Sequence, residues 1–301
     1  MKENKIYKIL CVISAIICIW LLSLSTCKAQ LPDGSVAPDW TLTDLNGTTH
    51  NLYSGYTVFI DFSAVWCPPC WTYHTSGALE NLYIQHGPVG LPNVDTNTTD
   101  DVMVFFIEGD GNTVANIGGN GGGTLGDWIT GTPYPIVCTD GTINTTAVKS
   151  AYAVSYWPTI YKVCPDRILV EAGQSSYPYN LVSACPPPAS NTNDAKVFTY
   201  NGETETCTGT LTPEIRLQNY GLTNLTSLEI KVYNNGALES TTPWTGNLAT
   251  YQVDNITLPT LTSIGFSFIE IRTTLPNGQL DDDISNNNCY FYSTLATQNV
   301  N

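Results

Sequence analysis

The sequence predicts an α/β domain followed by an all-β sandwich, and three observations lead to this prediction. Apolar runs of strand length alternate with helix-like segments through residues 30–188, which is typical of an α/β sandwich. Strand patterns separated by turn sequences, without a helical stretch, fill residues 189–301, which is typical of a β-sandwich. Residues 186–193 have the proline- and asparagine-rich composition of a linker. A chain of 301 residues is also long enough for two hydrophobic cores.

The segment 1–29 has the pattern of an export signal. Three lysines precede an almost wholly apolar run at residues 9–24, and small residues follow up to Ala29. This order predicts a secretory signal peptide that is cleaved after Ala29. An uncleaved membrane anchor and a lipoprotein modified at Cys27 remain alternatives, because the apolar run is long for a signal. We therefore expect a bacterial protein that is exported to the periplasm, to the outer surface or to the medium.

The composition is strongly acidic. The chain has 11 basic and 26 acidic residues, a net charge of −15. Removal of the signal would take away four lysines and one glutamate, and would leave a net charge of −18. Such a surface repels nucleic acid and anionic membranes. We expect no nucleic-acid partner, and membrane association only if the signal is uncleaved or lipidated.

The elements of the first domain follow from local patterns. A hairpin is expected around Asn46-Gly47, from 40–45 and 48–52. Two strands, 58–62 and 102–107, are apolar enough for the centre of a sheet. The remaining expected elements are a long helix at 71–85, a loop at 88–101, a glycine-rich segment at 118–123, strands at 134–138, 160–163 and 167–171, and helices at 145–153 and 179–184.

The first central strand runs directly into Cys67-Pro-Pro-Cys70 at the start of a helix. Unpaired N–H groups and the helix dipole favour an anion there, so we expect a lowered pKa for the Cys67 thiol and a nucleophilic thiolate. Cys70, one turn into the helix, would resolve a mixed disulfide. Since Pro68 and Pro69 have no N–H, the amide of Cys70 is the nearest donor to the Cys67 sulfur.

This cysteine pair has two alternative interpretations. A zinc site would need a second pair of ligands, and the chain has only three histidines, His50, His74 and His86, and no other closely paired cysteines. A purely structural disulfide is the second alternative.

The residues 61–70, Asp-Phe-Ser-Ala-Val-Trp-Cys-Pro-Pro-Cys, resemble the thioredoxin superfamily, closest to its exported thiol–disulfide oxidoreductases of the TlpA/ResA type. Residues 37–47 resemble the amino-terminal hairpin of that group, and residues 156–161 resemble its cis-proline loop. The resemblance covers about residues 31–188. It implies a thioredoxin-like domain, a central mixed sheet flanked by helices, and a cis bond before Pro158.

The resemblance also implies where a substrate would lie. The backbone at Trp157 would face the disulfide, where an extended substrate could pair with it, with Thr159 as a further contact. Trp66 and Trp71 flank the cysteines and are candidates for an apolar rim, although Trp66 could instead pack in the core. His74 is expected at an exposed helix position.

Asp61 lies where this superfamily places a buried acid beneath the disulfide. Burial would raise its pKa and let it exchange a proton with Cys70. A strand-end Asp that faces water or caps a turn is the alternative.

Seven cysteines remain after the signal, so at least one has no partner within the chain. Cys164 and Cys185 are candidates for a structural disulfide between a strand and the last helix, with Cys138 as an alternative partner for either. Cys207 and Cys289 lie near the two ends of the sandwich, and we expect a structural disulfide between them.

The second domain shows strand patterns at 214–217, 227–233, 251–258 and 265–268. Residues 212–221, Trp244-Thr-Gly246 and 281–288 resemble the CARDB-like immunoglobulin-type domains of secreted bacterial proteins. Asp281 and Asp283 are weak candidates for binding Ca²⁺, with a solvated acidic turn as the favoured alternative.

These features predict an exported protein-disulfide reductase or isomerase that works through Cys67 and Cys70. The resemblance implies client proteins with thiols or disulfides and an electron-donor protein as partners, and neither a metal nor an organic cofactor. A surface adhesion protein with a redox-inactive thioredoxin-like domain is one alternative. A thiol peroxidase is another, although peroxidases usually have a lone attacking cysteine.

Overall fold

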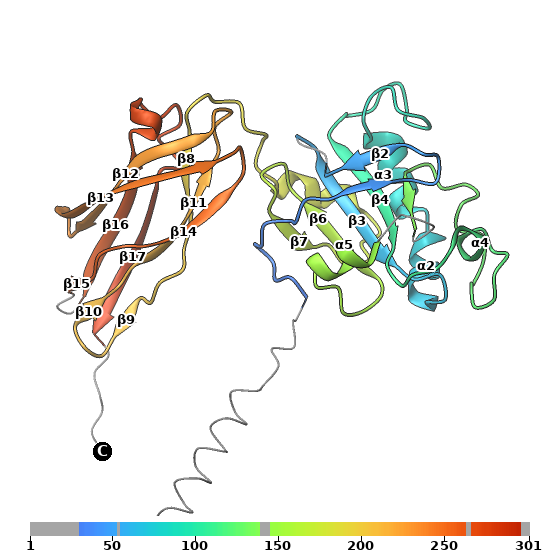
Figure 1. The fold of residues 1–301 in the computed structure, drawn as a ribbon, viewed down its shortest axis with the longest axis horizontal. Coiled ribbons are helices and arrows are strands. Elements are labelled where there is room, and N and C mark those ends of the chain that lie inside the picture. The colour runs from blue at the N-terminus through green and yellow to red at the C-terminus, as the bar shows by residue number, and fades with distance from the viewer. Residues whose placement is uncertain (1–29, 53–54, 139–144, 263–265, 296–301) are drawn as a thin grey trace, which may run out of the picture.

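The computed structural model describes residues 30–52, 55–138, 145–262 and 266–295. The predicted signal segment, 1–29, lies outside the described residues. Figure 1 shows an α/β domain and a β-sandwich side by side, joined by the chain between residues 185 and 195. Within the described ranges, no helix is long and apolar enough to cross a membrane.

The first domain is built on a five-stranded mixed sheet. β3 and β4 occupy its centre and are buried over their whole length, since both are continuous runs of mostly apolar residues. β4 is parallel to β3 and β5, while β6 is antiparallel to β3 and β7. The sheet order is β5-β4-β3-β6-β7, with β3 (Thr57–Ser63), β4 (Val102–Glu108), β5 (Ile136–Val137), β6 (Thr159–Val163) and β7 (Leu169–Glu171). The predicted hairpin is a separate pair, β1 (Thr41–Thr43) and β2 (Thr49–Asn51).

The single helix expected at 71–85 is two helices, α2 (Pro68–His74) and α3 (Ala78–His86). The break falls at Gly77, whose φ of +74° is a left-handed conformation that glycine adopts readily. The helix expected at 179–184 is a 3-10 helix, η1 (Pro178–Ala184). The other helices are α4 (Val114–Ile117) and α5 (Thr145–Ala151).

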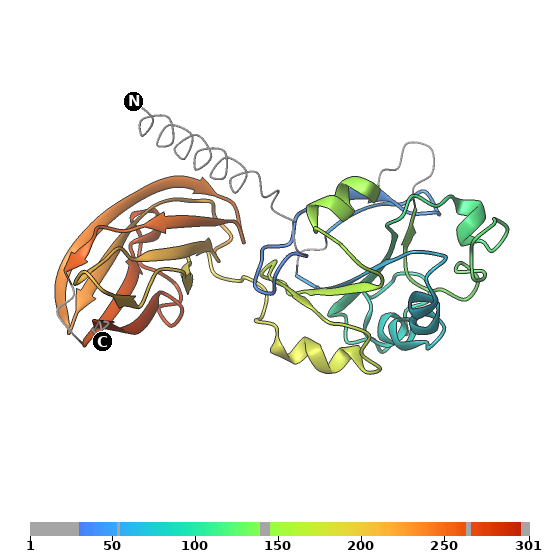
Figure 2. The same ribbon diagram turned by 90° about the horizontal axis from the view of Figure 1, so that it is seen from below.

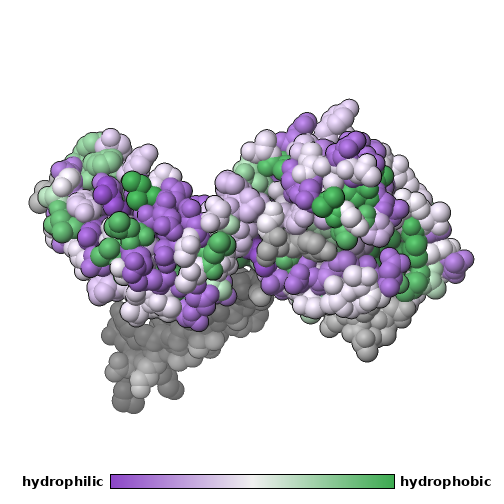
Figure 3. All heavy atoms as spheres, turned by 90° about the horizontal axis from the view of Figure 1, so that it is seen from above, coloured by the Kyte–Doolittle hydropathy of each residue, from purple (hydrophilic) through white to green (hydrophobic). Residues whose placement is uncertain are grey.

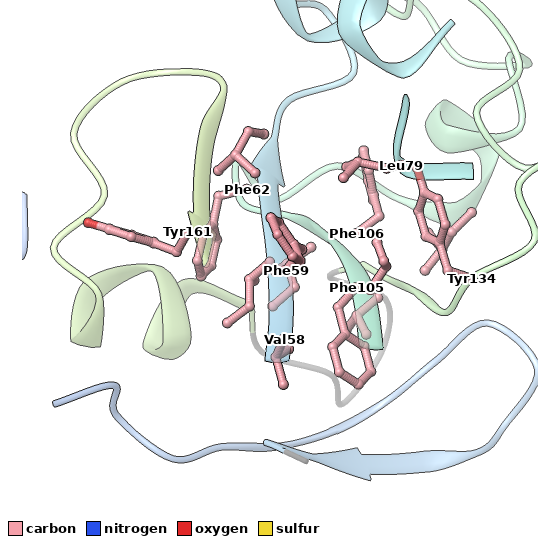
Figure 4. Packing of buried hydrophobic residues seen from close by; sticks show 14 of the residues in the cluster. Val58, Phe59, Phe62, Leu79, Phe105, Phe106, Tyr134 and Tyr161 are labelled. Atoms are coloured by element: carbon pink, nitrogen blue, oxygen red, sulfur yellow. The ribbon is translucent and has the colours of Figure 1, made fainter. Parts of the chain in front are cut away.

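Helices cover both faces of this sheet. Phe106 of β4 contacts His74 of α2, whereas Phe62 of β3 contacts Tyr152, which follows α5. Side chains alternate along a strand, so Asp61 and Phe62 point to opposite faces of the sheet. Asp61 lies on the same face as Phe106, which is the face covered by α2 and α3. Figure 4 shows aromatic side chains of the two neighbouring strands flanking β3, with Phe105 and Phe106 of β4 on one flank and Tyr161 of β6 on the other.

The second domain is a β-sandwich. Its inner apolar side chains include Leu217, Ile230 and Ile271, and they form a core separate from that of the first domain. One sheet has the order β14-β11-β8, with β8 (Ala195–Tyr200), β11 (Glu214–Asn219) and β14 (Val253–Thr257). The other has the order β13-β12-β16-β17-β9, with β9 (Glu205–Thr206), β12 (Leu225–Asn234), β13 (Ala237–Leu248), β16 (Ser267–Thr274) and β17 (Asn288–Leu295). A small pair, β10 (Thr210–Leu211) and β15 (Leu261–Thr262), and a 3-10 helix, η2 (Pro276–Gly278), complete the domain.

The predicted disulfide between Cys207 and Cys289 is wrong, because both thiols are free. The strand register gives the reason: β9 pairs with the end of β17, with Thr206 opposite Leu295. In space, Cys207 therefore lies just beyond the last residue of β17. Cys289 lies near the first residue of the same strand, opposite Ile271 of β16. Six residues of extended strand separate the two ends, roughly 20 Å at 3.3 Å per residue.

The two domains contact each other near the chain that joins them (Figure 2). Arg216 of β11 donates a hydrogen bond to the backbone oxygen of Gly34 at 3.1 Å. Gln218 donates to the backbone oxygen of Asp166 at 3.0 Å. On the face in Figure 3, hydrophilic residues cover much of both domains, with hydrophobic patches between them.

Candidate active site

Cys67 and Cys70 form a disulfide at the start of α2. Cys67 precedes the first turn of the helix, and its sulfur accepts a hydrogen bond from the backbone N–H of Cys70 at 3.3 Å. Pro68 and Pro69 occupy the first helical positions, which proline tolerates because an N–H there would have no helical partner. The amide of Cys70 is therefore the donor nearest to a Cys67 thiolate. Cys67 is 3% exposed and Cys70 is fully buried.

Trp66, the residue before the disulfide, is exposed at this site. Trp66 is 46% exposed, and its indole N–H donates to Asp110 Oδ2 at 2.7 Å. Asp110 lies just after β4, in a loop shaped by Glu108, whose carboxylate accepts from the backbone N–H groups of Asp110 and Asn112. The exposure of Trp66 excludes the alternative of core packing. The position agrees with the predicted rim.

The loop before β6 approaches the same place. The bond between Trp157 and Pro158 is cis, and β6 begins with Thr159 opposite Phe62 of β3. Pro158 therefore lies beside the end of β3, just before the cysteine motif. The Trp157 ring lies against Gly109, where an added Cβ would be 2.4 Å from the ring, so this close approach requires glycine.

Two residues of this site were not found by sequence reasoning. Lys149 Nζ lies 4.6 Å from the ring centre of Trp157 and 3.9 Å from Asp110 Oδ1. Asp110 and Lys149 thus connect Trp66 to Trp157 across the site. The sequence signal for Asp110 is its place just after a central parallel strand, where functional side chains often gather. No comparable signal marks Lys149.

Two of the predicted substrate contacts are placed differently. Thr159 is fully buried, and its hydroxyl donates to the backbone oxygen of Tyr156 at 2.9 Å, so its side chain supports the loop rather than facing a substrate. Trp71 is half-buried against Gly126 and Trp128, with the Trp128 ring centre at 4.9 Å. Trp71 therefore belongs mainly to the packing of α2.

Asp61 is fully buried, which excludes the alternative of an exposed strand-end residue. Its Oδ1 accepts a hydrogen bond from the Ser63 hydroxyl at 2.6 Å, while Oδ2 is buried without a hydrogen-bond partner. Burial raises the pKa of Asp61 to about 7; the Ser63 hydrogen bond lowers it and the charge of Glu80 raises it further. The carboxyl can thus exchange a proton near neutral pH.

His74 is buried, not exposed as predicted. Its ring packs against both Trp71 and Trp128, and burial lowers the pKa of His74 to about 4. Trp128 comes from a segment far along the chain, so the local helix pattern could not show this.

Cys164 and Cys185 form a disulfide, which is one of the candidate pairings. This disulfide joins the end of β6 to the end of η1. Cys138 is buried at the end of β5 and belongs to neither disulfide.

The acidic loop of the sandwich is used for backbone contacts. Asp281 Oδ2 accepts from the N–H of Ala195 at 3.0 Å, and Asp283 Oδ1 accepts from the N–H of Ser285 at 2.9 Å. Among the described residues, no group of three or more His, Cys, Asp or Glu side chains could hold a metal ion. The favoured alternative of an acidic turn at Asp281 and Asp283 fits these contacts.

Comparison with known proteins gives short sequence matches and fold-level likeness. Thiol-disulfide oxidoreductase ResA of Geobacillus kaustophilus is 49% identical over 45 residues, 14% of this chain and 26% of that protein. ResA of Geobacillus thermodenitrificans is 47% identical over the same length. The chain thus spans about a quarter of the length of the curated relatives it matches. No family model matches the chain.

Solved structures similar to the chain fall into two groups. The thioredoxin domain of a Bacteroides vulgatus thiol-disulfide oxidoreductase is 21% identical, with a TM-score of 0.37, and the match covers 51% of this chain and 97% of that one. A Pyrococcus furiosus CARDB domain, solved with di-metal ions, is 21% identical, with a TM-score of 0.30, and the match covers 35% and 96%.

The fold of each domain is defined by its own geometry. The first domain combines the sheet order β5-β4-β3-β6-β7, a C-x-x-C motif at the start of α2 and a cis-proline before β6. The second combines two sheets around one core, and their strands are antiparallel apart from the pairing of β9 with β17. The chain therefore joins a thioredoxin-like domain to an immunoglobulin-type β-sandwich, and over 45 residues it is similar to ResA-type thiol-disulfide oxidoreductases.

Proposed function

We propose that this protein is an exported protein-disulfide oxidoreductase, acting as a reductase or isomerase through Cys67 and Cys70. The observation that carries the proposal is the disulfide at the start of α2, whose Cys67 sulfur is held by the N–H of Cys70. A purely structural disulfide would not require an exposed tryptophan beside it or a buried acid with one unpaired oxygen beneath it, and this site has both, at Trp66 and Asp61.

In the reductive direction, the Cys67 thiolate attacks one sulfur of a client disulfide. The client S–S bond breaks, one client sulfur leaves as a thiolate, and the other is joined to Cys67. Cys70 then loses its proton to Asp61 and attacks the Cys67 sulfur. This second step releases the second client thiolate and leaves Cys67–Cys70 oxidised. Two electrons have passed to the client, and two electrons from a donor protein with a dithiol reset the site.

An extended client segment fits the surface between Trp66 and Trp157. Trp66 offers an exposed apolar face, and the backbone at Trp157 offers hydrogen-bonding groups for strand-like pairing. The sandwich serves as a binding or spacer domain in this proposal. The reaction itself requires neither a metal nor an organic cofactor.

Export is part of the proposal. It rests on the signal pattern of residues 1–29 and on the acidic, disulfide-containing composition of the rest of the chain. Localisation of the protein after expression, with and without residues 1–29, tests this part.

The test is turnover of a protein disulfide. Reduction of insulin by dithiothreitol should be accelerated by the protein and lost in the variants Cys67→Ser and Cys70→Ser. Consumption of hydrogen peroxide is measured with the same samples. Peroxide consumption that needs Cys67 but not Cys70 would favour a thiol peroxidase, and no turnover in either assay would favour a protein that only binds.

A further inference from the structure

A group of buried polar atoms without hydrogen-bond partners lies beneath α2. It consists of Asp61 Oδ2, Glu80 Oε2, His74 Nδ1 and Trp128 Nε1. Buried polar atoms are normally paired, so such a group requires an explanation. The proposed mechanism uses only Asp61. Glu80, in the first turn of α3, has no role in it.

Glu80 is held between α2 and the segment before β5. Its Oε1 accepts a hydrogen bond from the Tyr134 hydroxyl at 3.3 Å and lies 3.7 Å from His74 Nδ1. The Glu80 side chain is 17% exposed and the His74 side chain 6%. Figure 4 shows Tyr134 beside Leu79 and Phe106.

The hydrogen bond of His74 to Thr132 indicates which ring nitrogen of His74 carries the proton. The Thr132 hydroxyl donates its one hydrogen to the backbone oxygen of Trp128 at 2.7 Å. It can therefore only accept from His74 Nε2, which lies 3.4 Å away. A neutral His74 with its proton on Nε2 turns the lone pair of Nδ1 toward Glu80. A protonated Glu80 carboxyl can approach this lone pair favourably, and an ionised one cannot.

Among the residues that the structure describes, no Lys or Arg side chain pairs with Asp61 or Glu80. The groups that face Glu80 are His74 and Tyr73 of α2, Tyr134, and Asp61 of β3, and burial keeps the histidine neutral and the tyrosines protonated. Asp127 interacts with His74 and adds negative charge. Lys162 lies on the same face of the sheet, but it donates to the backbone oxygen of Leu181.

Two carboxyl groups that share a buried site without a cation do not both ionise near neutral pH. We propose that Asp61 and Glu80 hold one proton between them beneath Cys70, and that Glu80 is a positioning residue that keeps Asp61 able to accept the Cys70 proton. This inference rests on the proposed function. It assigns Glu80 a role that depends on charge and does not require contact with the substrate.

The role follows from the resolving step. When Glu80 holds the proton, Asp61 is ionised and takes the proton of the Cys70 thiol, and Cys70 attacks Cys67 as a thiolate. When Glu80 is ionised, its charge favours protonated Asp61, which cannot act as a base. In agreement, burial raises the pKa of Glu80, and the charge of Glu80 raises the pKa of Asp61.

The resolving step can be measured without any client protein. The reduced protein is mixed with the aromatic disulfide DTNB, which joins a chromophoric thiol to Cys67, and Cys70 then releases this thiol. The rate of that release is followed between pH 5 and pH 9 for the wild type, Glu80→Gln, Asp61→Asn and the double variant. Glu239→Gln, an exposed change in the sandwich, is the matched control. This assay requires only the dithiol, so it remains valid if insulin reduction fails.

Glu80→Gln keeps an acceptor for Tyr134 and a donor for His74, and it mimics the protonated acid permanently. We expect its pH midpoint to fall by at least half a unit relative to the wild type. In the Asp61→Asn background the same change should have no effect. A Glu80→Gln profile that superimposes on the wild type overturns the proposal. An equal shift in both backgrounds also overturns it, because Glu80 would then act without Asp61.

A second measurement covers the case in which Glu80→Gln does not fold. Carboxyl carbon NMR titration of the wild type reports both acids directly. One proton retained by the pair between pH 5 and pH 7 supports the proposal, and two independent ionisations complete by pH 6 overturn it.

Discussion

The indole N–H of Trp66 donates to Asp110 Oδ2 at 2.7 Å, which joins the residue before Cys67 to the loop after β4. The other carboxylate oxygen of Asp110 lies 3.9 Å from Lys149 Nζ, and Lys149 stands over the ring of Trp157. One carboxylate thus orients both tryptophans beside the disulfide. The Asp110 side chain is 38% exposed, so its ion pair should contribute little to stability.

Asp110→Ala should therefore lower the activity with protein substrates while it changes the stability of the fold only slightly. A hydrogen bond to a charged group contributes about 1.5 kcal/mol, so we expect roughly a tenfold lower kcat/KM for insulin. The rate with a small disulfide should stay close to that of the wild type, because a small molecule does not need the tryptophans. Asp95→Ala, an exposed change on a loop, is the control. An equal loss with both substrates would contradict this assignment.

The two cysteines should behave differently when changed separately. Cys70→Ser leaves Cys67 able to attack but removes the resolving thiol, so mixed disulfides with client proteins should accumulate. Cys67→Ser should accumulate none. After mild reduction, Cys67 should also be alkylated first at neutral pH. The species are measured by non-reducing electrophoresis and peptide mapping, and equal trapping by the two variants would reverse the assignment of roles.

Asp61→Asn should stabilise the protein at neutral pH. The pKa of Asp61 is raised from 3.8 in the unfolded chain to about 7 in the fold, so the wild type loses stability as the pH rises through this window. Each unit of raised pKa corresponds to about 1.4 kcal/mol, and Asn keeps an acceptor for Ser63. The difference in free energy of unfolding between variant and wild type should therefore be largest at pH 7–8 and should vanish near pH 4. Urea titrations at four pH values test this, and a difference that does not change with pH would disprove it.

The parts of the site that could be predicted depend on neighbours along the chain. The strand before Cys67, the disulfide motif and the two central strands follow from short apolar runs and one spacing. The burial of His74 could not be predicted, because Trp128 covers it from more than fifty residues away. The disulfide predicted between Cys207 and Cys289 was wrong for the same reason, since the order of strands in a sheet depends on residues far apart in the sequence.

Glu80 illustrates this limit for function. Its place in the first turn of α3 is an ordinary position for an acidic residue, because the helix dipole favours negative charge there. Its nearness to His74 and Tyr134 depends on the break at Gly77 and on the path of the chain before β5. Neither is visible in the local sequence.

The last prediction concerns the direction of electron flow. A strongly oxidising dithiol has its reduced form stabilised, as in DsbA at about −120 mV. Here the Cys67 sulfur accepts one hydrogen bond, from the N–H of Cys70, because Pro68 and Pro69 contribute no donor. Ionised Asp61 would add negative charge beneath Cys70. Both features destabilise the thiolate, so we expect a potential near that of thioredoxin, about −270 mV, and action as a reductant when electrons are supplied. Equilibration against a dithiothreitol series, followed by tryptophan fluorescence, measures the midpoint. A value more positive than about −180 mV, that of protein disulfide isomerase, would indicate an oxidase instead.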